Sequence, residues 1–249
     1  MNLETKNKVA VFISTYNQVD FTLPICLKYI QDQTYKDFIC VIGDDQSTDG
    51  TQEFCEKWCK DDKRFIYHRT PTKYVRNSLF YNWAAKEYKT DYIITCDGDN
   101  YICEEAIEKR LGAIEATGAA AVYSYCLCCT WNKEKTEIID RYVRGRKWDI
   151  NSYVHGTCWN NYIDMCDIIF NRQCYLDVGG YMTGGRSYQD YSIMIRLAMK
   201  YNNRIYYIPE VLSQYNSFSD GQLRTIDAGD YHAPSRINIF ADNPKEWSL

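Results

Sequence analysis

The sequence lacks long apolar runs. Nowhere do about 18 apolar residues follow one another, the length that a membrane-spanning helix needs. No apolar segment follows basic residues at the start of the sequence, so we expect no export signal and a cytoplasmic protein. Binding to a membrane surface without a transmembrane segment stays open. Without export, the 12 cysteines should be reduced thiols.

The sequence also lacks an excess of positive charge. Its 29 Lys and Arg face 33 Asp and Glu, and the net charge of −4 argues against a nucleic-acid-binding protein, which would carry a basic face. A phosphate ligand would therefore need local help from a metal ion or a helix terminus. The paired C-x2-C spacing of a zinc site is absent too, so we interpret the cysteines as small buried apolar residues.

The sequence does contain apolar strands that alternate with helical patterns. With 249 residues and 45% apolar content, the chain can bury the core of one globular domain. We expect strands at 8–15, 38–43, 64–68, 92–96, 119–131, 163–170 and 204–208. Helices are expected after 17 to about 33, from 51 onward, and at 78–86, 106–114, 174–179 and 189–201; residues 132–163 read as hairpin and loop. This alternation predicts an α/β fold with parallel strands and right-handed crossovers.

One strand ends in two carboxylates. The apolar run from Tyr92 to Cys96 is followed directly by Asp97, Gly98 and Asp99. At the carboxyl end of a strand in an α/β sheet, side chains project to where ligands bind. Two aspartates on one turn can share a hard cation, and Mg²⁺ or Mn²⁺ is usually completed by water and substrate phosphates. The alternative is a solvated Asp-Gly-Asp turn.

Four segments, in order, resemble the family-2 glycosyltransferases, which have a nucleotide-sugar-binding GT-A fold. They are Ser14-Thr15-Tyr16-Asn17 after the first strand, Gln33-Thr34-Tyr35 with Val41 to Thr51, the run from Tyr92 to Asn100, and Gln189-Asp190-Tyr191. The resemblance implies a single domain at 1–216, with a Rossmann-like central mixed sheet flanked by helices. About 8–100 would bind the nucleotide-sugar, 101–216 would bind the acceptor and carry the catalytic group, and 217–249 would form a C-terminal tail or lid.

The resemblance also implies roles for individual residues. The residues that would contact the donor nucleotide are Ser14, Thr15, Tyr16, Asn17, Asp45, Asn82, Asp97 and Gly98. Asp45 would accept the uracil N3–H of a UDP-sugar, the favoured donor. Asp99, helped by Asp97, would hold Mn²⁺ or Mg²⁺ at the diphosphate. Asn82 stands at the Asn of the family's A-R-N motif.

The chain departs from the family's pattern at three positions. Tyr81 stands where the A-R-N motif has Arg, so diphosphate contacts are expected from Lys73 or Arg76, whose alternative is a solvated loop charge. Gln46 replaces a Gly, at little expected cost because Ser47 and Asp49 still supply turn chemistry. Gln189 replaces the usual Glu before Asp190.

Asp190 is the candidate catalytic base. An acceptor hydroxyl must lose its proton as it attacks the anomeric carbon, and a carboxylate within hydrogen-bond reach can take it. A single displacement with one base inverts the anomeric configuration. The alternative for Asp190 is a helix-capping residue. Asp164 could contact the acceptor or the donor sugar, or be a salt-bridged structural residue, and Trp159 could stack on a sugar or pack in the core.

We therefore expect metal-dependent transfer of a sugar from a nucleotide-diphosphate-sugar to a hydroxyl of a glycan or other acceptor. The Gln-x-x-Arg-Trp motif of processive synthases does not occur in the sequence, which favours a non-processive enzyme. One alternative is a sugar-nucleotide pyrophosphorylase, although the Gly-rich loop of those enzymes is replaced here by Thr15 to Gln18. The other is a catalytically inactive glycan-binding pseudoenzyme, which would be expected to lack Asp99 or Asp190.

Overall fold

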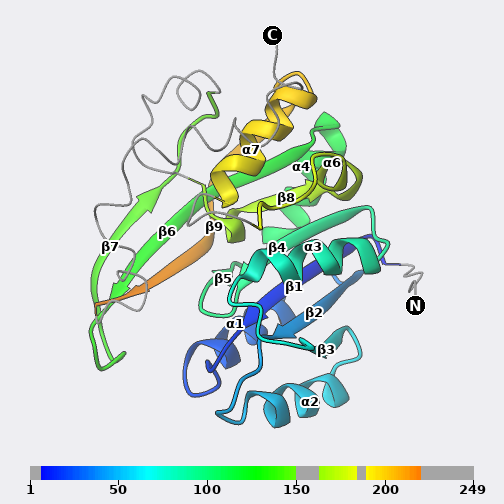
Figure 1. Ribbon diagram of the computed structural model, residues 1–249. Helices are drawn as coiled ribbons and strands as arrows, with labels where there is room; N and C mark the ends of the chain where they lie inside the picture. Colours follow the sequence, from blue (N-terminus) through cyan, green and yellow to red (C-terminus); the bar gives the residue numbers. More distant parts are fainter. Residues whose placement is uncertain (1–6, 150–162, 184–188, 220–249) are drawn as a thin grey trace.

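The computed structural model describes residues 7–149, 163–183 and 189–219. Its centre is a mixed sheet in which nine strands are described (Figure 1). The strands are β1 (Val9–Thr15), β2 (Phe38–Asp44), β3 (Phe65–Arg69), β4 (Tyr92–Asp97), β5 (Tyr101–Ile102), β6 (Ala121–Trp131), β7 (Ile138–Arg144), β8 (Ile168–Asn171) and β9 (Ile205–Phe218). The helices are α1 (Thr22–Gln31), α2 (Thr51–Asp61), α3 (Asn77–Glu87), α4 (Ala106–Thr117), the 3₁₀ turn η1 (Met165–Asp167), α6 (Arg172–Asp177) and α7 (Gln189–Lys200).

The first half of the chain forms the parallel part of the sheet. Strands β3, β2, β1 and β4 lie side by side in that order, and every pair among these neighbours is parallel. The connecting helices α1, α2 and α3 provide the crossovers that parallel strands require. The Rossmann-like half predicted by the alternating pattern is confirmed, and so is the mixed α/β fold.

The second half extends the sheet with strands of both directions. Strand β8 pairs antiparallel with β4 and with β6, whereas β6 pairs parallel with β9. Strand β7 pairs antiparallel with β6, which confirms a hairpin within residues 132–149. In Figure 1, β6, β7 and β9 form a long arm on the left, away from β1–β4.

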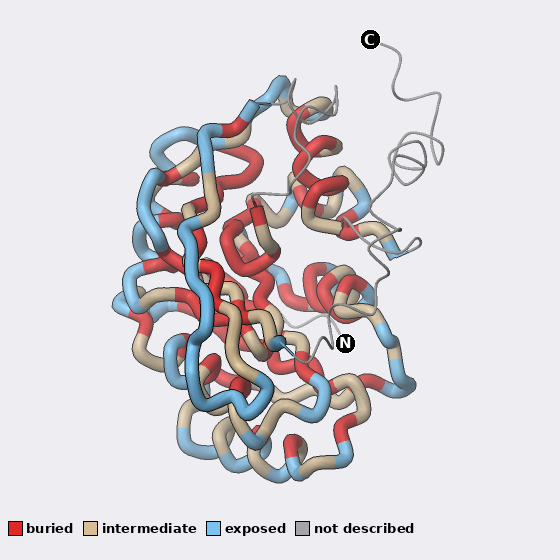
Figure 2. The backbone as a smooth tube through the Cα atoms, turned by 90° about the vertical axis from the view of Figure 1, so that its left-hand side faces the viewer, coloured by how far each residue is buried: buried red, intermediate tan, exposed pale blue. Residues whose placement is uncertain are grey.

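Two apolar cores cover the two faces of the sheet. Residues of α3, α6 and α7 pack on one face with Phe12 and Tyr123, and residues of α1, α2 and α4 pack on the other face with Val11 and Ile13. Figure 2 shows the buried residues gathered along the strands and the inner sides of the helices. The strands β1 and β2 are buried almost throughout, as expected for strands covered on both faces.

Three local expectations were wrong. The segment 163–170 is not one strand, because Asp164 caps the 3₁₀ turn η1 and β8 begins only at Ile168. The last strand does not stop before Pro209 but continues to Phe218, past register shifts opposite Tyr125. Asp49, followed three residues later by Gln52, is a sequence pattern that predicts a capping box, but Gly50 is the N-cap of α2 and the Gln52 amide donates to Glu56 instead.

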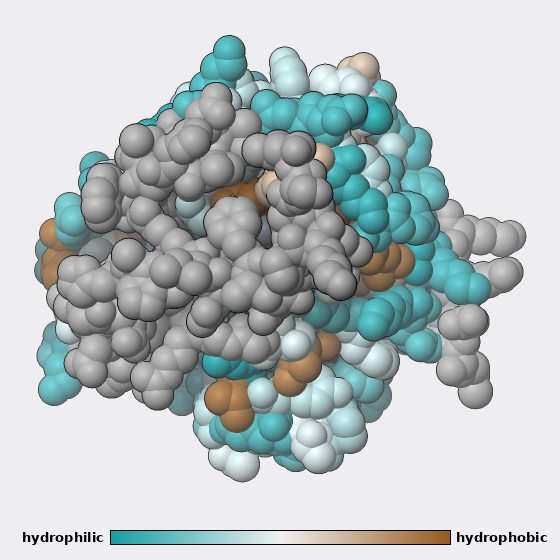
Figure 3. All heavy atoms as spheres, turned by 45° about the horizontal axis from the view of Figure 1, so that its top comes forward, coloured by the Kyte–Doolittle hydropathy of each residue, from teal (hydrophilic) through white to brown (hydrophobic). Residues whose placement is uncertain are grey.

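None of the described helices is long and apolar enough to cross a membrane. On the face shown in Figure 3, the visible described surface is mostly hydrophilic, with small hydrophobic patches.

Candidate active site

The carboxyl ends of three parallel strands meet at one edge of the sheet. In the register of the sheet, Ser14 on β1 lies beside Gly43 on β2 and Asp97 on β4. The chain just beyond each strand is tied to β1: Gly98 N donates to Ser14 O (2.8 Å) and Asp45 N donates to Thr15 O (2.9 Å). Parallel strands end at a common edge, so this edge brings together residues that are far apart in sequence.

Helix α3 orients the first carboxylate of the turn. Asn77 Nδ2 and Tyr81 Oη both donate to Asp97 Oδ1, each at 2.7 Å. The two donors are four residues apart and therefore lie on one face of the helix. Burial raises the pKa of Asp97 above its ordinary value, and these two hydrogen bonds oppose that rise. One oxygen of Asp97 is thus fixed, which leaves its second oxygen without a donor among the described residues.

The second carboxylate of the turn carries more unbalanced charge. Burial and the neighbouring Asp97 carboxylate raise the pKa of Asp99 to about 8. The backbone of the turn is held from the far end of the sheet, because Asn216 on β9 donates its side-chain amide to Asp99 O (2.7 Å) and its backbone N–H to Asn100 Oδ1 (2.9 Å). The backbone of Asp99 is therefore held in place, while no cationic side chain among the described residues pairs with its carboxylate.

Gly98 is required at the centre of this turn for space. A Cβ atom at this position would lie 2.6 Å from Gln18 Oε1 and 3.2 Å from the Thr15 side chain. The Thr15 hydroxyl is itself bonded to Gln18 Oε1 (2.8 Å), which fixes both neighbours. The turn can pack this closely against the loop after β1 only because residue 98 has no side chain.

Two further aspartates face the turn. Asp164, at the start of η1, contributes to the raised pKa of Asp99. The pKa of Asp164 is itself raised to about 7 by burial and by the carboxylates of Asp167, Asp190 and Asp97. The Arg144 guanidinium opposes this rise. Asp190 lies in the first turn of α7, as predicted, and accepts the Tyr191 N–H at 2.8 Å. Asp97, Asp99 and Asp164 thus lie within electrostatic reach of one another, and Asp190 lies within electrostatic reach of Asp164.

Asp164 is salt-bridged, which was one of its two predicted readings, while its contact with a sugar stays a prediction. Its Oδ2 lies 3.5 Å from Arg144 Nη2, so it is salt-bridged, and yet it belongs to the same group of carboxylates. Asp167, the other aspartate of this segment, is fully buried and accepts from the Asp164 N–H (2.7 Å) and the Ser213 hydroxyl (2.5 Å). Asp167 is therefore structural.

The residues of the turn fit a divalent cation. Within the described ranges no Lys, Arg or His forms an ion pair with Asp97 or Asp99, and their mutual repulsion shows an excess of negative charge. Two carboxylate oxygens with water and a diphosphate make the ligand set that Mg²⁺ and Mn²⁺ prefer. In the same ranges, the only three potential ligands within 4.8 Å of one another are Cys126, Cys166 and Asp167. That group does not fit, because the thiols are neutral and Asp167 is already bonded.

The residues predicted to contact the nucleobase gather beside β2. Asn17, in the left-handed conformation (φ 51°), receives the Thr48 N–H on its Oδ1 at 2.8 Å. Tyr16 is 43% exposed, and Lys73 Nζ lies 3.2 Å from its ring centroid. Asp45 accepts the backbone N–H of Tyr74 (2.5 Å) and that of Val75 (3.0 Å).

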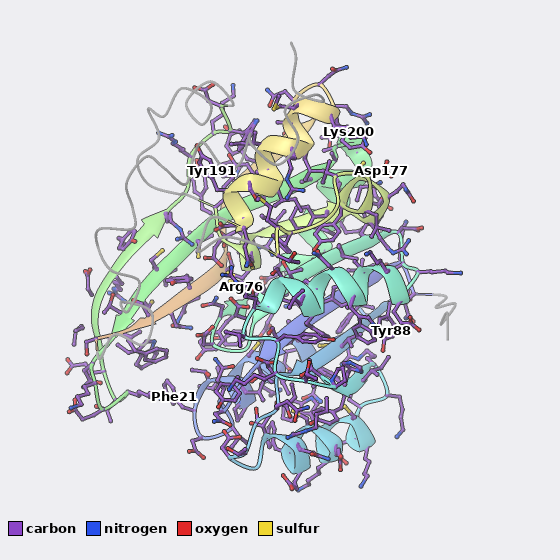
Figure 4. The ribbon with its side chains drawn as sticks, in the orientation of Figure 1. Phe21, Arg76, Tyr88, Asp177, Tyr191 and Lys200 are labelled. Carbon is purple, nitrogen blue, oxygen red and sulfur yellow. The ribbon has the colours of Figure 1, made fainter. Side chains whose placement is uncertain are left out.

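Arg76 and Asn82 lie on opposite parts of α3. Arg76, half-buried, precedes the helix, and no described residue pairs with its side chain. Figure 4 shows Arg76 on the side of the molecule where α7 begins. The Asn82 side chain bonds to Tyr175 Oη (2.6 Å) and to the backbone of Tyr181 (2.7 and 2.9 Å), so it holds the segment after α6. All of these bonds are to the protein's own residues, so the contact of Asn82 with the nucleotide stays a prediction.

One sequence-predicted site residue, Trp159, lies outside the described residues, so its sugar-stacking role stays a prediction. Four residues that the sequence reasoning missed also belong to the site. Asn77 and Tyr81 could have been found from their i,i+4 spacing, but Arg144 and Tyr215 could not. The Arg144 guanidinium lies 5.1 Å from the Tyr215 ring centroid. Burial raises the pKa of Tyr215, and the nearby acidic residues, Asp164 first, raise it further.

Solved structures identify the class of this fold. Staphylococcus aureus TarS (residues 1–349) in complex with UDP aligns with a TM-score of 0.63 at 16% identity, over 84% of this chain and 60% of that one. The mannosyltransferase PcManGT from Pyrobaculum calidifontis, in complex with GDP-Man and Mn²⁺, aligns with a TM-score of 0.61 at 16% identity, over 85% and 57%. The chain has the GT-A glycosyltransferase fold.

The sequence itself places the chain in a family. The model of the family described as glycosyl transferase family 2 matches residues 10–173, so the chain belongs to that family. The putative glycosyltransferase EpsE of Bacillus subtilis is 31% identical over 111 residues, which are 43% of this chain and 38% of EpsE. Glycosyltransferase GlyA of Streptococcus pneumoniae is 29% identical over 102 residues, 41% and 14%. The chain thus spans less than half the length of these two curated relatives.

Proposed function

We propose that this glycosyltransferase carries out metal-dependent, inverting and non-processive transfer of a sugar from a nucleotide-diphosphate-sugar to an acceptor hydroxyl. The observation that carries the proposal is a series of neighbouring carboxylates: Asp97 and Asp99 follow the parallel strand β4, Asp164 acts on Asp99, and Asp190 acts on Asp164. Structures of the same fold bind UDP, UDP-GlcNAc or GDP-Man, which supports a nucleotide-sugar as the donor.

In this proposal, the turn after β4 holds the donor diphosphate through a cation. Asp99 and the free oxygen of Asp97 would ligate Mn²⁺ or Mg²⁺. The bound ion would supply Lewis-acid stabilisation of the charge that develops on the leaving diphosphate. Asn77 and Tyr81 keep Asp97 in position for this role. Arg76, which precedes α3 and pairs with none of the described residues, would contact the same diphosphate.

Asp190 would accept the proton of the acceptor hydroxyl. Its place in the first turn of α7 favours the ionised carboxylate, since the N-terminal end of a helix carries partial positive charge. Asp164 is close enough to both Asp190 and Asp97 that each of these carboxylates raises its pKa. We assign Asp164 to the sugar that is transferred or to the acceptor, with Arg144 holding the orientation of its carboxylate.

The test is a thermal-shift experiment with UDP-, GDP-, dTDP- and CMP-sugars, each with Mn²⁺ and with chelator. A ligand at about 100 times its dissociation constant stabilises a protein by roughly 2.7 kcal/mol, a clear shift. We expect one nucleotide class to stabilise the chain with Mn²⁺ but not with chelator, and to release nucleoside diphosphate when an acceptor is present.

Two variants make this test specific. Asp99→Ala should abolish the Mn²⁺-dependent shift. Asp61→Asn removes an exposed carboxylate at the end of α2 and should retain the shift. If no nucleotide-sugar stabilises the chain under any condition, the proposed function is wrong. Stabilisation without any transfer to an acceptor would instead favour the glycan-binding pseudoenzyme.

A further inference from the structure

The carboxylate assigned to the nucleobase is already bonded to the chain's own backbone. The loop 70–76 connects β3 to α3 and contacts the side chain of Asp45. Tyr74 N–H donates to Asp45 Oδ1 and Val75 N–H donates to Asp45 Oδ2, so each carboxylate oxygen has one loop amide. The Thr70 hydroxyl adds a longer contact to Oδ1 at 3.4 Å. A nucleobase that approaches Asp45 must therefore compete with this loop.

The loop is held in a conformation that its sequence disfavours. Val75 has φ 63°, in the left-handed region, where a β-branched residue is an outlier. This conformation is disfavoured for an L-residue, because its Cβ atom comes too close to the following carbonyl oxygen. The Val75 side chain is 79% exposed, so packing contributes little to offset that cost. The hydrogen bond from its N–H to Asp45 is the contact that fixes it.

The same loop covers a second residue assigned to the base. Lys73 Nζ lies 3.2 Å from the centroid of the Tyr16 ring, which is otherwise among the exposed aromatic rings of the chain. A base could stack on this face of Tyr16 only after Lys73 has moved. The loop thus occupies both the hydrogen-bonding and the stacking partner of the base, and it carries two cations, Lys73 and Arg76.

We propose that loop 70–76 is an internal competitor of the donor nucleobase. N–H groups of the base replace one or both of the Tyr74 and Val75 amides on Asp45, Lys73 leaves the Tyr16 ring, and Val75 relaxes from its left-handed conformation. This exchange frees Lys73 to join Arg76 at the diphosphate. The inference deepens the proposed function and rests on it. Its energetic consequence is that donor affinity is reduced by whatever free energy holds the loop in place.

The shared chemistry of the ligand is a base with ring N–H donors, and two bases meet it differently. Uracil presents one such N–H, which can replace one loop amide. Guanine presents N1–H and the adjacent amino group, and this pair matches a carboxylate that accepts one donor on each oxygen. The number of loop amides that lose their hydrogen bond to Asp45 therefore distinguishes a uracil nucleotide from a guanine nucleotide.

The test is hydrogen–deuterium exchange of the full chain, with Mn²⁺ and either UDP or GDP, resolved at the amides of Tyr74 and Val75. A hydrogen bond to a charged group contributes about 1.5–3 kcal/mol, so its loss should speed exchange about ten- to a hundredfold. We expect faster exchange at one of these amides with UDP or at both with GDP. Slower exchange is expected in the segment around Asp45.

A pair of variants tests the strain. Val75→Asn introduces a residue that tolerates the left-handed conformation. The loop conformation that is bonded to Asp45 then becomes more stable, and nucleotide affinity should fall about fivefold. Lys135→Asn is the matched control, because Lys135 is exposed and left-handed (φ 59°) in the distant β6–β7 turn, and it should leave affinity unchanged. Equal affinities of Val75→Asn and wild type would refute the role of the strain.

Two other outcomes separate this inference from the proposed function. If a nucleotide binds, as thermal shift shows, while the Tyr74 and Val75 amides stay protected, the competitor role is overturned and the transferase assignment stands. If no nucleotide binds at all, both are overturned.

Discussion

Replacing Asp99 by Asn should remove a pH-dependent loss of folding stability from the metal-free protein. Burial and Asp97 raise the pKa of Asp99 to about 8, far above the value of about 3.9 in an unfolded chain. The folded state therefore binds this proton more tightly than the unfolded state does. Its contribution to stability is fully present below about pH 4 and is lost as the pH rises through about 8.

The magnitude follows from the linkage of one proton. Between about pH 4 and 8, the free energy of unfolding of the wild type should fall by at most roughly 1.4 kcal/mol per pH unit because of Asp99. Asp99→Asn is neutral throughout and should show a flatter profile, with higher stability than the wild type near pH 8. A cation competes with the same proton, so the affinity of the wild type for Mn²⁺ should rise by up to about tenfold per pH unit over this window.

The assay is urea unfolding in chelator at four pH values from 5 to about 8, with Mn²⁺ titrations at the same values. Asp61→Asn, which changes an exposed carboxylate, should keep the profile of the wild type. Parallel profiles for Asp99→Asn and the wild type would refute the reasoning. So would Mn²⁺ affinity that is the same at both ends of the window.

Three further substitutions test other parts of the site. Tyr81→Phe removes a donor from Asp97 and should cost about 1–3 kcal/mol of stability in urea unfolding, because the carboxylate stays buried; it should also weaken Mn²⁺ binding, since the pKa of Asp97 rises further. Gly98→Ala forces a Cβ against Gln18 and should lower the free energy of unfolding by about 1–3 kcal/mol. Asp190→Asn should slow transfer by about 10²–10⁴-fold in an acceptor assay and leave donor affinity unchanged.

The parallel half of the sheet was predictable because its signals are local. Strands β1, β2 and β4 are short apolar runs that end in polar turn residues, and both the strand and its end can be read from a few neighbouring positions. Helix α7 was predictable for the same reason. Its apolar residues recur at helical spacing, and Asp190 stands at its start.

The part of the site formed by the second half of the chain was not predictable, because it depends on contacts between residues that are far apart in sequence. Asn216 holds the Asp99 backbone across 117 residues of sequence, and nothing near Asn216 indicates that role. Arg144 lies on an edge strand whose residues are mostly exposed, yet its guanidinium meets Asp164 on another element. Asp164 itself was expected within a strand, because Ile163 to Phe170 is largely apolar. Its cap on η1 follows from side-chain hydrogen bonds, which a pattern of hydrophobicity does not contain.

Gln46 shows how a departure from a family's pattern can carry information. The sequence predicts little cost for Gln at this position, because Ser47 and Asp49 would supply turn chemistry. Asp49 does accept the Thr51 N–H at 3.1 Å, and Ser47 and Asp49 also accept the N–H groups of Asn17 and Val19. The backbone of Gln46, however, is left-handed at φ 66°, where Gly would avoid a cost of roughly 1–2 kcal/mol.

The Gln46 side chain offers something that Gly lacks. Its amide donates to Thr70 O, at the start of loop 70–76, and its Oε1 accepts from Arg69 Nη2 at 3.4 Å. One strained residue thus anchors the loop at its beginning, and a second, Val75, is fixed on Asp45 near its end. Loop 70–76 is thus held by two left-handed residues, Gln46 of the neighbouring loop and its own Val75, and it lies on Asp45 and Tyr16, which are assigned to the donor.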